Sequence, residues 1–147
     1  MAYSQEVFDR SDDQSDRLTS LYGLTPKVES AIIDAVQSGA VHRLRTLVAP
    51  LHPADQADLL ERLPTRSATA MVRLLGDHLD AETLTYVDET TREAIIGAIG
   101  TDGLARQLQD LSTDDAITII EELEQDDLQD VLAALSAEDR VLVEEGL

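Results

Sequence analysis

Carboxylates are the side chains of this chain whose number and spacing could do chemistry. The sequence holds 30 Asp and Glu against 11 Lys and Arg, a formal net charge of −19. Residues 101–147 alone hold 14 acidic and 2 basic side chains, so this third contributes −12. Carboxylate oxygens suit Mg²⁺ or Ca²⁺, and Mg²⁺ often takes only one or two of them because it keeps much of its water. We therefore expect an acidic ridge, with a solvated helix face as the alternative. Its members are Asp114-Asp115, Glu121-Glu122-Glu124 and Asp126-Asp127-Asp130.

The carboxylates of this ridge differ in the local roles that the sequence predicts. Ser112 precedes Asp115 by three residues, a spacing typical of a capping box, and Ser136 precedes Asp139 in the same way. Asp114 has no such local role, and its place beside a helix start predicts a side chain that projects outward. The DxDxDG loop of an EF-hand does not occur. Three further carboxylates are expected to face solvent: Glu121, Glu122 and Asp130.

No motif with a catalytic mechanism occurs in the sequence, and we expect no enzyme. The histidines His42, His52 and His78 are ten and 26 residues apart, without the spacing of a zinc site. His52 precedes Pro53 at an expected helix start, where a turn or capping role is favoured. The chain has no Cys, which removes cysteine nucleophiles, thiolate zinc sites and disulfides. Three glycines are expected at helix ends rather than in a phosphate loop: Gly97, Gly100 and Gly103.

The charge and hydropathy also limit which partners and which cellular compartment the chain can have. An acidic surface repels nucleic acid and anionic lipid headgroups, and it attracts cations or a basic partner. No apolar run approaches the roughly 18 residues of a membrane span. Residues 1–10 lack the apolar core of a signal peptide. The sequence therefore predicts a soluble, cytosolic chain.

The elements that must position these side chains repeat every twelve residues. Apolar residues recur at this period, which predicts units of one short helix and one tight turn. Such a helix has about eight or nine residues, roughly 13 Å, and persists only by packing on its neighbours. The first apolar column is Leu51, Leu63, Leu75, Val87, Ile99, Leu111, Leu123, Leu135 and Leu147. The second is Leu60, Val72, Leu84, Ile96, Leu108, Ile120 and Leu132, interrupted at Glu144.

The remaining segments extend this helical prediction. Residues 1–24 are expected to form a polar tail, with a frayed helix near residues 17–22. Thr25-Pro26 should open a helix that Ser38-Gly39 closes, and a second helix should cover residues 41–48. Residues 116–120 have the propensity of a strand, but their acidic flanks fit the first and last turns of a helix. Alternating short helices of this kind stack as a curved superhelix, a small α-solenoid.

Residues 51–64, with the sequence LHPADQADLLERLP, resemble the intracellular N domain of MgtE-type magnesium transporters. The repeats at residues 111–115 and 135–140 are similar to later repeats of that family, and the resemblance covers about residues 26–147. It implies an all-α, right-handed superhelix of about ten short helices for the domain at residues 25–147. In the family, CBS domains and a membrane transport domain follow the N domain, and cytosolic Mg²⁺ between the N and CBS domains favours the closed pore.

The resemblance also implies the metal ligands. The acidic residue of the LSxDD turn corresponds to Asp114, and that of the preceding AAEVL-like helix corresponds to Glu82, although Thr83 stands where the family often has an apolar residue. Asp115 is a third candidate, which capping also explains. The cofactor is Mg²⁺, weakly bound and shared with CBS domains of the same or a neighbouring chain. The implied location is the cytoplasmic face of the inner membrane, within a transporter that can be a homodimer.

Two functions are compatible with these observations. The first is a Mg²⁺-sensing regulatory domain of an MgtE-like transporter, favoured by the HPAD segment and the acidic ridge. The second is a stand-alone superhelical scaffold that binds protein partners without metal, as flagellar motor-switch proteins do with similar short-helix repeats.

Overall fold

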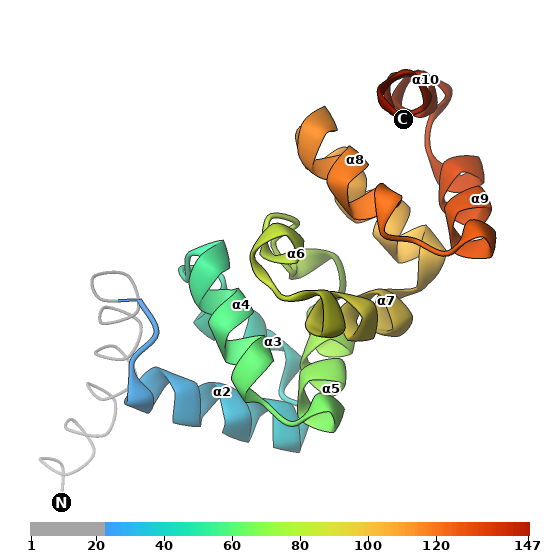
Figure 1. Ribbon diagram of the computed structural model, residues 1–147. Helices are drawn as coiled ribbons and strands as arrows, with labels where there is room; N and C mark the ends of the chain where they lie inside the picture. The colour runs from blue at the N-terminus through green and yellow to red at the C-terminus, as the bar shows by residue number, and fades with distance from the viewer. Residues whose placement is uncertain (1–22) are drawn as a thin grey trace, which may run out of the picture.

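The structure, a computed structural model, describes residues 23–147, and this range consists of helices and connecting turns without a strand (Figure 1). The all-α prediction is confirmed for this range, and residues 116–120 are helical. The helix expected near residues 17–22 lies outside the described residues. The helices are α2 (Pro26–Ser38), α3 (Val41–Val48), α4 (Pro53–Arg62), α5 (Thr65–Leu75), the 3₁₀ helix η1 (Gly76–His78), α6 (Thr83–Tyr86), α7 (Glu89–Gln109), α8 (Thr113–Glu121), α9 (Gln125–Ala134) and α10 (Ala137–Gly146).

Capping residues set the ends of several helices where the sequence predicted them. The Thr25 hydroxyl accepts a hydrogen bond from the amide of Val28 at 3.3 Å, and Gly39 closes α2 in the left-handed conformation with φ of 68°. The hydroxyls of Ser112 and Ser136 each accept a bond of 3.2 Å from the amide three residues later. These bonds satisfy amide groups that a helix start would otherwise leave unpaired.

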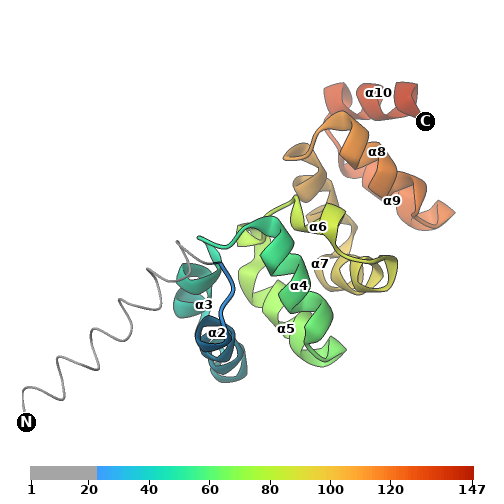
Figure 2. The same ribbon diagram turned by 60° about the vertical axis from the view of Figure 1, so that its left-hand side comes forward.

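The helices form two rows, in which each helix packs on the helix two places along the chain. One row contains α4, α6, α8 and α10, and the other contains α3, α5, α7 and α9, while α2 packs on α3 and α5. Figures 1 and 2 show that the helices follow one another from α2 at one end of the molecule to α10 at the other. Within the first row α6 contacts both α4 and α8, which matters for the candidate site.

The two apolar columns contribute 10 of the 28 buried residues of the aliphatic core in the described range. In the second column, every residue is buried except Ile96, which is half-buried, and Glu144, which pairs with Arg140 on the surface. In the first column, Leu147 is exposed, with 52% of its surface accessible. Four residues of the first column are buried, namely Leu51, Leu75, Val87 and Leu135, and four are half-buried, namely Leu63, Ile99, Leu111 and Leu123.

Two segments differ from a uniform series of eight- or nine-residue helices. The unit after Gly76 splits into η1 and the four-residue α6, because the Asp80 carboxylate accepts a hydrogen bond of 3.0 Å from the Glu82 amide and holds a turn there. In α7, Gly100 has φ of 74° and ψ of 175° and interrupts the helix at a unit boundary. Gly97 and Gly103, also expected at helix ends, lie within α7 on either side of this break.

Candidate metal-binding residues and the acidic surface

A buried arginine joins the elements that carry the candidate ligands. Arg92, at the start of α7, donates a hydrogen bond from Nε to the carbonyl of Leu84 at 2.8 Å and from Nη2 to that of Val87 at 3.2 Å. Its Nη1 forms an ion pair with Glu122, which follows the last residue of α8. The side chain of Arg92 is only 11% exposed. It therefore fixes the end of α6 against the end of α8.

A second buried contact holds α6 against α4. The Thr83 hydroxyl donates a hydrogen bond to the Gln56 side-chain oxygen at 3.2 Å, and Gln56 donates from its amide nitrogen to the carbonyl of Leu51 at 3.2 Å. Thr83 and Gln56 are both buried. Thr83 is the position at which the sequence departs from the family pattern, and this bond satisfies its hydroxyl inside the core.

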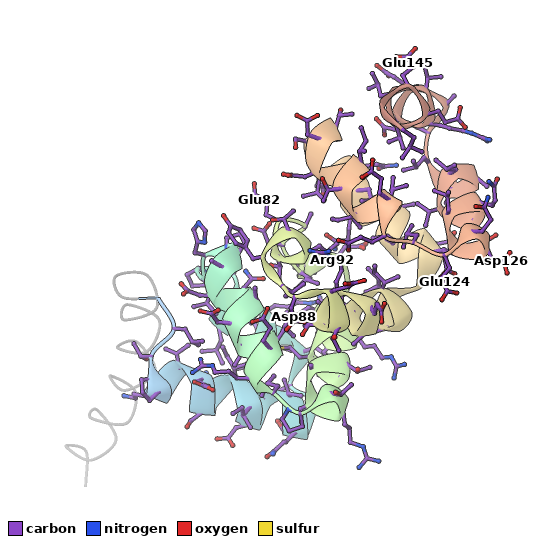
Figure 3. All side chains as sticks on the ribbon, viewed as in Figure 1. Glu82, Asp88, Arg92, Glu124, Asp126 and Glu145 are labelled. Carbon is purple, nitrogen blue, oxygen red and sulfur yellow. The ribbon has the colours of Figure 1, made fainter. Side chains whose placement is uncertain are left out.

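Glu82 lies at the start of α6 and is exposed. Figure 3 shows its side chain pointing outward from α6. It borders a groove of about 370 Å³ whose wall also includes Asp77, Asp80 and Asp110. Glu82 makes no ion pair within the part of the chain that the structure describes. The carboxylate is therefore available to a ligand from outside.

Asp114 and Asp115 occupy the first turn of α8, and both are exposed as predicted for Asp114. A helix N-terminus favours negative charge because unpaired amides carry partial positive charge. The amide of Asp115 is capped by Ser112, as the capping-box spacing predicted, but within residues 23–147 the Asp115 carboxylate makes no return hydrogen bond.

The three candidates do not form a metal site by themselves. Helices α6 and α8 are in contact, so Glu82 and Asp114 belong to neighbouring helices of one row. Among residues 23–147, however, no three His, Asp or Glu side chains are grouped so that they could hold a metal ion. The structure places the candidates on adjacent helices, and no described residues complete a three-ligand group with them.

The expected acidic ridge is divided into two parts. The nine residues of α8 span about 13 Å and separate Asp114 and Asp115 at its start from the acidic residues that follow its end. Figure 3 shows Glu124 and Asp126 beside the start of α9, away from Glu82. The acidic residues therefore do not form one continuous ridge, because α8 lies between the two parts.

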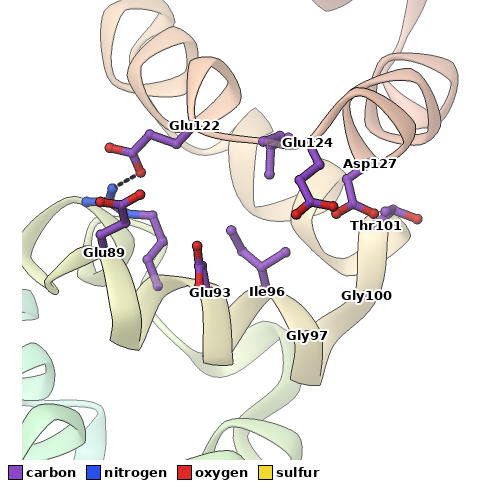
Figure 4. A pocket seen from close by; sticks show the side chains of 11 residues that line it. Glu89, Glu93, Ile96, Gly97, Gly100, Thr101, Glu122, Glu124 and Asp127 are labelled. Carbon is purple, nitrogen blue, oxygen red and sulfur yellow. Dashed lines mark hydrogen bonds and ion pairs between the residues drawn. The ribbon is translucent and has the colours of Figure 1, made fainter.

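The second part borders a groove of about 420 Å³ between α7 and the α8–α9 turn. Figure 4 shows Glu89 and Glu93 on α7 across from Glu124 and Asp127, with Ile96 between them. This groove was not predicted from the sequence, because Glu89 and Glu93 lie outside the acidic run. Their four-residue spacing, which continues to Gly97, was the signal that they share one helix face.

One carboxylate has a pKa that departs clearly from its ordinary value. The backbone amide of Thr91 donates a hydrogen bond of 2.7 Å to Asp88, which caps the start of α7, and this bond, with a second from the Thr91 side chain, lowers the pKa of Asp88. His52 has the capping role expected of it, since its Nδ1 accepts a bond of 3.0 Å from the Ala54 amide.

The family assignment agrees with this arrangement. The model of the MgtE intracellular N domain matches residues 51–147, and the chain belongs to this family. The match begins at the LHPAD segment, so α2 and α3 precede it and pack on α5 within it. No curated protein matches the chain. In the described part of the chain, no helix is long and apolar enough to cross a membrane.

Proposed function

We propose that this chain is the cytosolic regulatory domain of an MgtE-like magnesium transporter, in which Mg²⁺ bridges it to a following CBS domain and favours the closed pore. The observation that carries the proposal is the family match together with exposed Glu82 and Asp114 on two adjacent helices. The domain then lies at the cytoplasmic face of the inner membrane and meets CBS domains of the same or a neighbouring chain, in a transporter that can be a homodimer.

In this proposal Asp114 is the first bridging ligand, Glu82 the second and Asp115 a weaker third. None of the three is ion-paired within residues 23–147. Mg²⁺ gives up its water reluctantly, so one or two carboxylates hold it only weakly, with an affinity on the order of millimolar. At low Mg²⁺ the acidic surfaces of this domain and the CBS domain repel each other. At high Mg²⁺, ions bound between the two surfaces hold them together. Regulation then follows from a higher affinity for Mg²⁺ in the closed state.

The proposal also assigns the two rows of helices to one right-handed superhelix with a twelve-residue unit. The candidate ligands then lie at the starts of α6 and α8, two neighbouring helices of one row. The rigidity of this superhelix would come from buried contacts between the rows, such as those of Arg92, and within a row, such as that of Thr83 with Gln56.

The test is protection from protease by Mg²⁺ in a polypeptide in which CBS domains follow this chain. The substitutions Asp114→Ala and Glu82→Ala should each raise the Mg²⁺ concentration needed for protection, on the order of tenfold. Each removes a carboxylate that coordinates Mg²⁺ in the closed state. Glu138→Ala is the matched control, since Glu138 is also exposed in the first turn of a helix of the same row.

Equal protection of the parent and both variants at one Mg²⁺ concentration would remove these residues from the sensor. A shift of the same size in Glu138→Ala would show that total negative charge, rather than these two positions, controls the response.

A further inference from the structure

We propose that the groove between α7 and the α8–α9 turn, here called the α7–α9 groove, is a docking site for a cationic, amphipathic segment of a partner protein. It lies beyond the end of α8, whereas Asp114 lies at the start of that helix. The proposal therefore goes beyond Mg²⁺ sensing and does not depend on it.

The floor of the groove is apolar and open. Ile96 and Leu123 line it and are half-buried, so each retains surface that a partner side chain can cover. Gly97 and Gly100 also line it, and a Cβ atom added at either would meet nothing within 4 Å. The missing side chains leave room for a partner backbone or aliphatic stem to approach α7 closely.

The walls of the groove carry more carboxylates than cations, since Arg92, the cation among its lining residues, already pairs with Glu122. Glu89 and Glu93 on one side, and Glu124 and Asp127 on the other, make no ion pair within the described residues (Figure 4). Arginine and lysine combine an aliphatic stem with a charged end, so they fit an apolar floor between carboxylates. A segment with basic and apolar residues on one face matches both features.

The same charges exclude the simplest other occupants. A second copy of this chain would bring a net charge of −19 and few cations, and the arginines at positions 62, 92, 106 and 140 already pair within the chain. A bare metal ion would use the carboxylates, but among residues 23–147 no three are grouped closely enough to hold one. The apolar floor would contribute nothing to such a site.

One wall of the groove is fixed before any partner binds. Glu122 lines it and pairs with buried Arg92, which is bonded to two carbonyls at the end of α6. A preformed wall lowers the entropic cost of binding, because fewer side chains must be ordered.

The test measures binding of a fluorescent peptide, with Arg and Leu on one helical face, to the full chain by anisotropy in EDTA. Glu93→Gln combined with Asp127→Asn should weaken binding tenfold or more. Asp126→Asn combined with Glu145→Gln removes the same charge from positions that do not line the groove and should change affinity less than threefold (Figure 3). Replacing Leu by Ser in the peptide should also weaken binding.

A third variant separates docking from general attraction. Gly97→Leu places a side chain in the groove, where the backbone is helical and space is open, so helix stability should not fall. We expect at least a tenfold loss of peptide affinity with an unchanged or higher Tm. Three results would each overturn the proposal. These are an equal loss of peptide affinity in the two double variants, an unchanged affinity in Gly97→Leu, and no binding of the peptide to the parent chain.

Discussion

Replacement of the buried Arg92 by methionine should destabilise the fold far more than a comparable change at the surface. Methionine keeps much of the aliphatic volume but cannot donate the bonds to the carbonyls of Leu84 and Val87, at 2.8 and 3.2 Å. Hydrogen bonds from a charged donor contribute about 1.5–3 kcal/mol each. The ion pair with Glu122 adds about 1 kcal/mol or less, because the Glu122 side chain is 36% exposed.

Methionine also removes the desolvation cost of burying the Arg92 charge, which offsets part of this loss. We therefore expect Arg92→Met to lower the free energy of unfolding by about 2–4 kcal/mol. For a chain of this size, that corresponds to a fall in Tm on the order of 5–15 °C. Urea unfolding followed by circular dichroism measures the change. Arg106→Met is the matched control, because Arg106 pairs with Asp77 at 3.1 Å but its side chain is 59% exposed, and it should cost under about 0.5 kcal/mol.

A double-mutant cycle with Glu122→Gln separates the ion pair from the carbonyl contacts. If Arg92→Met and Arg106→Met cost the same, the guanidinium of Arg92 does not hold α6 against α8. In that case Arg92 would not be what positions the helices that carry Glu82 and Asp114.

Further predictions concern the core, the charge and a capping carboxylate. Leu108→Ala should cost about 2–5 kcal/mol in urea unfolding, since Leu108 is 4% exposed, and no loss would remove it from the core. The Tm should rise in both NaCl and MgCl₂, because residues 101–147 place 14 acids against 2 bases, and a flat or falling Tm would show that repulsion is unimportant. The pKa of Asp88 is lowered in the fold, so its stabilising effect is present at neutral pH and is lost as pH falls through that lowered pKa. The stability difference between the parent and Asp88→Asn should therefore shrink in acid unfolding series, and a difference independent of pH would contradict this.

The helix boundaries were predictable where a local capping signal marks them. Thr25, Gly39, Ser112 and Ser136 act within three or four residues of their own position, so the sequence alone reveals them. The short α6 was not predictable from the twelve-residue period. Its length depends on a turn held by Asp80 and on contacts with residues about 27 positions earlier, as in the bond between Thr83 and Gln56.

The candidate site divides in the same way. The exposure of Asp114 followed from its place in a first helical turn, which is a local property. The α7–α9 groove was missed because its two walls are about 30 residues apart in sequence, as the pairing of Arg92 with Glu122 illustrates. Such a surface exists only after the turn between α8 and α9 has packed on α7. No local pattern in the acidic run could show which carboxylates face which.

The two-row packing implies that protection against amide hydrogen exchange is graded along the molecule. In an array where each helix packs mainly on near neighbours, segments at an end can open without unfolding the rest. Helices α4 and α5 each bury four residues, whereas α10 buries only Val143. We therefore expect amides of α10 to exchange through local opening while those of α4 and α5 exchange only through global unfolding. A protein bound in the α7–α9 groove would slow exchange in the helices that it contacts and leave the local opening of α10 unchanged, so the exchange pattern would reveal where the partner binds.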